Sequence, residues 1–125
     1  MAQRVLVTAG AGGIGQAIAT RFVATGAKVH VADIDTDAID RLRATEPRIS
    51  ATVADVARPQ DVARLFDDVK RELGGLDVLV NNAGIAGPTA SAAEYPLAGW
   101  REVVGVNLDG TFLVTQRAIP MLRES

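Results

Sequence analysis

A glycine-rich segment near the N-terminus has the residue types and spacing of a phosphate-binding loop. Residues 10–15, Gly-Ala-Gly-Gly-Ile-Gly, follow a short β-branched run and precede a helical pattern. Glycines at this spacing allow a tight turn, a close approach of phosphates to the backbone, and close packing of helix against strand. The N–H groups at the start of the helix attract anions. A turn that only joins strand to helix is the alternative. We assign five of these residues to dinucleotide binding: Gly10, Gly12, Gly13, Ile14 and Gly15.

A carboxylate stands at the end of the next strand pattern. Asp33 follows Gly15 by eighteen residues, where an acid can accept hydrogen bonds from both hydroxyls of an adenosine ribose and would repel a 2′-phosphate. Its neighbours Ile34 and Asp35 bring no positive charge, and Gly12 occupies the position from which a basic side chain could reach that phosphate. We therefore expect NAD rather than NADP, the alternative being an Asp that only caps a turn.

Alternating strand and helix patterns must position these residues. Short apolar runs predict strands at 4–8, 28–33, 49–53 and 77–80. Ile14, Ile18 and Phe22 recur every four residues, with Ala17 and Val23 beside them, as one helical face. Further helices are predicted at 37–45, at 59–73 and in two segments of 97–122. Those two segments should meet near Gly105, and Pro120 should kink or end the second. Buried strands joined by helical crossovers predict an α/β fold with a doubly wound parallel sheet of the Rossmann type.

Length and composition limit the remaining possibilities. The 125 residues suit a single domain, and 48% hydrophobic with 22% charged residues suits a globular one. Thirteen basic and fifteen acidic side chains without a basic run argue against a nucleic-acid partner. The absence of cysteine and the single histidine, His30, argue against a metal site. No apolar run approaches the ~20 residues of a membrane span, and the start lacks a signal-peptide pattern, so we expect a cytoplasmic protein without membrane contact.

Four motifs in order resemble those of the short-chain dehydrogenases/reductases. Asn81-Asn82-Ala83-Gly84 follows the fourth strand pattern, as the family's Asn-Asn-Ala-Gly does. Residues 8–15 are similar to its Thr-Gly-x-x-x-Gly-x-Gly, except that Ala9 replaces the first glycine. Asp55-Val56 resembles the pair that holds the adenine edge in the family, and residues 106–112 resemble the helix segment with its catalytic asparagine. The resemblance extends from the first strand to about Leu122.

The resemblance implies an NAD-dependent oxidoreductase that transfers hydride between nicotinamide and a secondary alcohol or ketone. It also implies a small-molecule substrate, a homo-oligomer and the strand order 3-2-1-4. Asn107 would be catalytic, because the main-chain carbonyl of the family's asparagine orders a water in the proton relay. Each motif also has a structural alternative. Residues 81–84 could form only a turn that ends a strand, Asp55 could be a capping or surface acid, and Asn107 could be an asparagine bonded to the backbone in the middle of a helix. Five further residues would join the cofactor site: Asp55, Val56, Asn82, Ala83 and Gly84.

The family's remaining catalytic residues, a Tyr-x-x-x-Lys pair and a serine, follow a fifth strand that is not reached here. Gly99 stands four positions after Tyr95, so we interpret this tyrosine as a loop residue, and His30 as a hydrogen-bonded residue on a strand. Residues 1–125 are expected to form one NAD-binding domain, truncated before the fifth strand and inactive alone. The alternatives are a non-catalytic NAD-binding module and a scaffold half that pairs with another chain.

Overall fold

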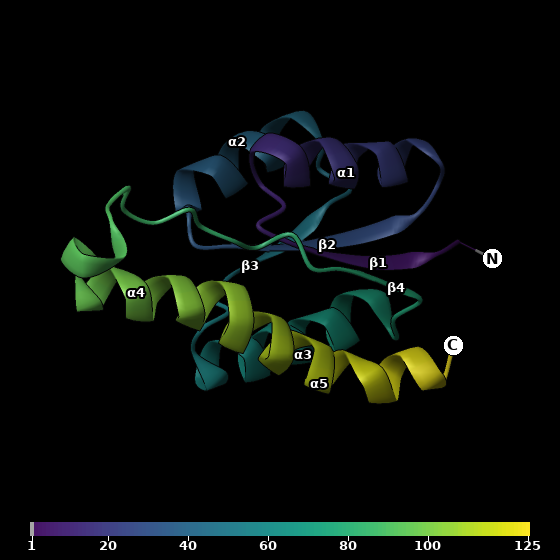
Figure 1. Ribbon diagram of the computed structural model, residues 1–125. Helices are drawn as coiled ribbons and strands as arrows, with labels where there is room; N and C mark the ends of the chain where they lie inside the picture. The colour runs from purple at the N-terminus through teal and green to yellow at the C-terminus, as the bar shows by residue number, and fades with distance from the viewer. Residues whose placement is uncertain (1) are drawn as a thin grey trace.

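Four parallel strands form a sheet in the order β3-β2-β1-β4 in the computed structural model, which describes residues 2–125. The strands are β1 (Arg4–Thr8), β2 (Lys28–Asp33), β3 (Ser50–Val53) and β4 (Val78–Val80). Helices α1 (Gly13–Ala24) and α2 (Thr36–Thr45) cover one face, and α3 (Pro59–Leu73) and α5 (Thr111–Arg123) cover the other (Figure 1). The predicted α/β fold class and strand order are confirmed.

The alternation of side chains along β1 divides the core into two layers. Val5 and Val7 belong to the cluster under α1 and α2, whereas Leu6 between them belongs to the cluster under α3 and α5. All three are fully buried, as expected for a central parallel strand covered on both faces. The core therefore fixes which way each residue of β1 points, and with it the position of the loop that follows.

The helix boundaries have local causes. Asp35 accepts a hydrogen bond from the Ala38 N–H at 3.0 Å and so caps α2. Pro59 occupies the first turn of α3, where its missing N–H costs nothing, and Gly74 ends that helix in the left-handed conformation with φ 77°. These signals agree with the predicted boundaries.

The buried face of α1 differs from the predicted one. Its fully buried residues are Gly15, Ala19 and Val23, whereas Ile14 is 74% exposed. Ile18 and Phe22 lie only at the margin of the core. The prediction was wrong because small residues stand where helix and strand approach most closely, and they displace the larger apolar stripe by one position.

The C-terminal helical stretch is interrupted by a π-helical segment. Helix α4 (Leu97–Val104) is followed by η2 (Gly105–Gly110) and then by α5. The predicted junction near Gly105 is confirmed. Pro120 was predicted to kink or end the helix, but the helix does not end there and continues to Arg123.

His30 joins β2 to β3 inside the core. Its Nδ1 lies 2.6 Å from Ser50 Oγ, and its Nε2 lies 2.7 Å from Thr52 Oγ1, which in turn donates to Asp68 at 2.6 Å. Burial lowers the pKa of His30 from 6.5 to about 4. The histidine is therefore neutral and hydrogen-bonded. The hydrogen bonding was predicted, whereas its burial on an interior strand was not.

Within residues 2–125, no helix is long and apolar enough to cross a membrane. The same part of the chain holds no group of three or more His, Cys, Asp or Glu side chains arranged around a possible metal.

Candidate nucleotide-binding site

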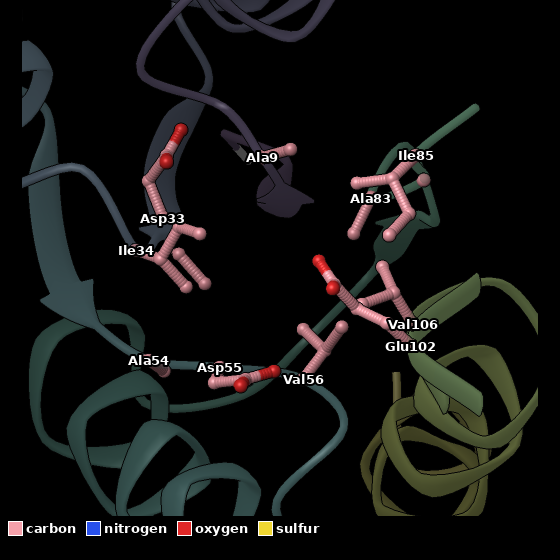
Figure 2. A pocket seen from close by; sticks show the side chains of 12 residues that line it. Ala9, Asp33, Ile34, Ala54, Asp55, Val56, Ala83, Ile85, Glu102 and Val106 are labelled. Carbon is pink, nitrogen blue, oxygen red and sulfur yellow. The ribbon is translucent and has the colours of Figure 1, made fainter. Parts of the chain in front are cut away.

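A cavity of about 320 Å³ opens at the carboxyl ends of the strands. It is lined by residues at or just after the ends of β1, β2, β3 and β4, together with Glu102 of α4 and Val106 of η2 (Figure 2). This is the edge of an open parallel sheet at which ligands bind in doubly wound folds. The lining consists of small and apolar side chains and three carboxylates: Ala9, Ala32, Asp33, Ile34, Ala54, Asp55, Val56, Ala83, Gly84, Ile85, Glu102 and Val106.

Asp33 lies at the end of β2 and holds the neighbouring loops. Its Oδ2 accepts from the Ala11 N–H and its Oδ1 from the Asp35 N–H, both at 3.1 Å. Each carboxylate oxygen has a second lone pair, so the group can still accept hydrogen bonds from a ligand. Asp33 thus ties the glycine loop to the sheet while remaining an acceptor at the cavity wall.

The glycines of the loop have two different environments. A Cβ on Gly10 would lie 2.6 Å from Val31 Cγ1, and a Cβ on Gly15 would collide with the Ala9 carbonyl. A Cβ on Gly12 or Gly13 would meet nothing within 4 Å, and no side chain caps the helix that begins there. The first pair is required by packing. The second leaves a cradle beside unpaired N–H groups, which fits the phosphates of a dinucleotide.

Ala9, the departure from the family's motif, adopts the conformation that a glycine would. Its φ is 51°, and it is the one non-glycine residue with positive φ among those the structure describes. Asn82 supports it by donating from Nδ2 to the Ala9 carbonyl at 3.3 Å. The Thr8 hydroxyl accepts from the N–H groups of Asn82 and Ala83, both at 3.0 Å. The turn is therefore retained, and β4 is joined to the loop after β1.

Asp55 and Val56 form the floor of the cavity. Asp55 Oδ1 accepts from the Ala57 N–H at 2.9 Å, and its Oδ2 lies 3.7 Å from Arg58 Nε. Val56 is buried and also packs on Gly110, where a Cβ would approach Val56 Cγ2 to 2.6 Å. The close contact joins the cavity floor to the end of η2.

Asn107 lies in the π-helical segment behind the cavity wall. Its Oδ1 accepts from the Ile85 N–H at 2.8 Å, and its Nδ2 donates to the Ile85 carbonyl at 2.9 Å. Its own carbonyl accepts from Thr111 Oγ1 at 2.9 Å. The side chain is thus used to hold the loop after β4, and π-helical turns of this kind often occur at functional sites.

Five of the assigned residues line the cavity directly: Asp33, Asp55, Val56, Ala83 and Gly84. The assigned residues of the glycine loop are not among its lining. Asn82 and Asn107 do not line it either, but they hydrogen-bond to Ala9 and Ile85, which do. Tyr95 lines a different hollow beside Trp100, away from this cavity. The assignments from sequence did not include Ala9, Ala32, Ile34, Ala54, Ile85, Glu102 and Val106. The four-residue spacing of Glu102 and Val106, which places both on one helical side before Asn107, was the available signal.

Comparison with known proteins gives the family. The profile described as short chain dehydrogenase matches residues 3–125. The chain is 40% identical to 1-deoxy-11-beta-hydroxypentalenate dehydrogenase of Streptomyces exfoliatus, over 95% of this chain and 45% of that protein. It is also 40% identical to L-fucose dehydrogenase of Bos taurus, over 97% of this chain and 45% of that protein. The chain spans about half the length of the curated relatives it matches.

A solved structure has the same arrangement of elements. The 3-ketoacyl-(acyl-carrier-protein) reductase from Brucella melitensis, complexed with NADH, superposes with a TM-score of 0.93 and 32% identity. The match covers 98% of this chain and 51% of that one. The family profile, the dehydrogenases and this structure agree with the motifs and the strand order. The chain belongs to the short-chain dehydrogenase family of oxidoreductases.

Proposed function

We propose that this chain is the nucleotide-binding part of an NAD-dependent oxidoreductase that acts on a secondary alcohol or ketone. The observation that carries the cofactor assignment is the Asp33 carboxylate at the cavity wall, with no basic residue among the cavity's lining. A 2′-phosphate placed there would meet a negative charge without compensation, which disfavours NADP. The relatives' activity on alcohols supports the substrate class.

Different residues of the site would bind different parts of the dinucleotide. Gly12, Gly13 and the N–H groups that follow would hold the pyrophosphate, and Asp33 would accept from the adenosine ribose. Asp55 and Val56 would take the adenine, and the segment 82–84 would border the other half of the cofactor. When bound, the nicotinamide accepts or releases the hydride. The tight contacts of Gly10 and Gly15 keep the helix N-terminus close enough for these interactions.

Asn107 is the catalytic residue that we assign to this chain. Its carbonyl accepts from Thr111 Oγ1 and is the group that would order a water molecule, as in the family, while its amide holds Ile85. The tyrosine–lysine pair of the family has no counterpart here, since the lysines are Lys28 and Lys70. We therefore propose that the 125-residue chain alone is inactive and that catalysis requires the residues that the longer relatives contain.

An apolar surface on η2 and α5 supports a homo-oligomer. Leu108, Phe112 and Ile119 are 66%, 59% and 41% exposed and line one hollow. Val114 is buried and Leu113 packs against the core, so these two apolar residues of α5 are not part of the exposed surface. Contiguous apolar patches commonly mark interfaces.

We propose a cytoplasmic location on the basis of composition alone.

The edge of the sheet supports a second candidate function, a half-domain that pairs with another chain. Strand β4 has a partner on one side only, β1, and its three residues are apolar. An open apolar edge invites another strand. NADH formation with secondary alcohols decides between the two functions. If the chain is a half-domain, NADH should form only after a second chain with a Tyr-x-x-x-Lys segment is added.

Calorimetric titration of NAD and NADP tests the cofactor assignment. We expect tighter binding of NAD, and Asp33→Ala should weaken it by about 1.5–3 kcal/mol, as for a hydrogen bond to a charged group. Asp40→Ala, which removes an exposed carboxylate of α2, serves as the control and should bind NAD like the unmodified protein. Equal or tighter binding of NADP by the unmodified protein would contradict the assignment.

A further inference from the structure

One of the three carboxylates that line the cavity has no partner in the protein. Asp33 accepts two backbone N–H groups, and Asp55 accepts one and pairs with Arg58. Glu102, an exposed residue of α4 at the rim of the cavity, makes no hydrogen bond or ion pair with any residue of the range 2–125. Figure 2 shows its carboxylate pointing into the middle of the cavity, whereas that of Asp33 turns toward the glycine loop. Glu102 is therefore the acceptor left free for a ligand.

The walls around Glu102 indicate the kind of ligand. Val106 stands one helical turn further along the same side, and Ile34, Val56 and Ile85 supply the other apolar surfaces. Apolar walls with a few polar groups at an edge suit a flat heteroaromatic ring. An ionised carboxylate only accepts hydrogen bonds, so the ring must present N–H groups at that edge.

We propose that Glu102 is a specificity-determining residue that accepts a hydrogen bond from the 6-amino group of the adenine. The proposal rests on the dinucleotide site described above and deepens it. The amino group carries two N–H donors, and Asp55 and Glu102 approach the cavity from different elements, so each carboxylate can take one. A 6-oxo purine presents an acceptor at the same place. Its one donor on that edge is N1–H, so at least one of the two carboxylates would lose its donor and face the oxygen, and binding would be weaker.

The discrimination can be measured with NAD and with nicotinamide hypoxanthine dinucleotide, which has oxygen in place of the amino group. We expect the unmodified protein to bind NAD on the order of tenfold more tightly or better, the ratio for a hydrogen bond to a charged group. In Glu102→Gln this ratio should fall, because the amide can accept from an amino group or donate to an oxygen, and the part that remains should be that of Asp55. Glu102→Ala should lower the ratio mainly by weakening NAD.

Glu124→Gln, the same chemical change at an exposed residue after α5, is the matched control and should retain the full ratio. An unchanged ratio in both Glu102 variants, with NAD still bound, would overturn this proposal and leave the NAD site intact. If Asp55→Asn alone abolished the ratio while Glu102→Gln kept it, the discrimination would belong to Asp55 and the proposal would fall. Failure of the unmodified protein to bind either dinucleotide would instead overturn the proposed function, and this proposal with it.

Discussion

Adding one methyl group at Gly15 should lower the stability of the fold, whereas the same change at Gly12 should affect mainly cofactor binding. An alanine there would gain about 1 kcal/mol of helix propensity. Its Cβ, however, would collide with the Ala9 carbonyl and lie 2.6 Å from Asn82 Nδ2, which donates to that carbonyl. Overpacking costs about 1–3 kcal/mol, and loss of the hydrogen bond about 1 kcal/mol more. We expect Gly15→Ala to lower the free energy of unfolding by about 2 kcal/mol.

The control is Gly12→Ala, three residues earlier in the same loop. Gly12 has φ −151°, which any residue adopts, and its Cβ would meet nothing within 4 Å. Its unfolding free energy should remain within about 0.5 kcal/mol of the unmodified protein. Its affinity for NAD should fall on the order of tenfold or more, because the methyl group enters the phosphate cradle. Urea denaturation followed by circular dichroism, with calorimetric titration, measures both. A Gly15→Ala variant as stable as the unmodified protein would refute the reasoning.

Three further outcomes follow from individual residues. Ala9→Gly should stabilise the fold by about 0.5–1 kcal/mol, because removing left-handed strain outweighs the entropy of glycine, whereas Ala24→Gly in the exposed part of α1 should cost about 1 kcal/mol in the same denaturation assay. For His30, the unfolded chain binds a proton below a pKa of 6.5 but the folded one only below about 4, so stability should fall by about 3 kcal/mol as the pH drops through that window. His30→Gln should lack this slope in unfolding measured against pH, and a slope that persists would contradict the assignment. Asn107→Ala should speed hydrogen exchange at the Ile85 amide on the order of tenfold, since its hydrogen-bond partner is lost; unchanged exchange would mean that the loop is held by other contacts.

Local patterns were sufficient for the order of the elements and for five of the twelve residues that line the cavity. Residues 10–15, Asp33 and Asp55 stand at or just after the ends of strand patterns, and in a parallel sheet the carboxyl ends of the strands lie at one edge. Strand order followed from the resemblance to the family and is found as expected. Sequence therefore determined the class of fold and the edge of the sheet at which the cavity opens.

Only the tertiary structure decided which side chains meet across that edge. The buried side of α1 depends on how closely the helix approaches β1, and a hydrophobic pattern does not contain that distance. The left-handed Ala9 is held by Asn82, more than seventy residues away, and Asn107 reaches back to Ile85 across the cavity wall. Glu102 becomes notable because packing leaves it without a partner while Asp33 and Asp55 have theirs. The hydrophobic period of a helix or strand indicates which of its sides faces the core. It does not indicate which residues of other elements a side chain contacts, because folding brings those elements together from distant parts of the sequence.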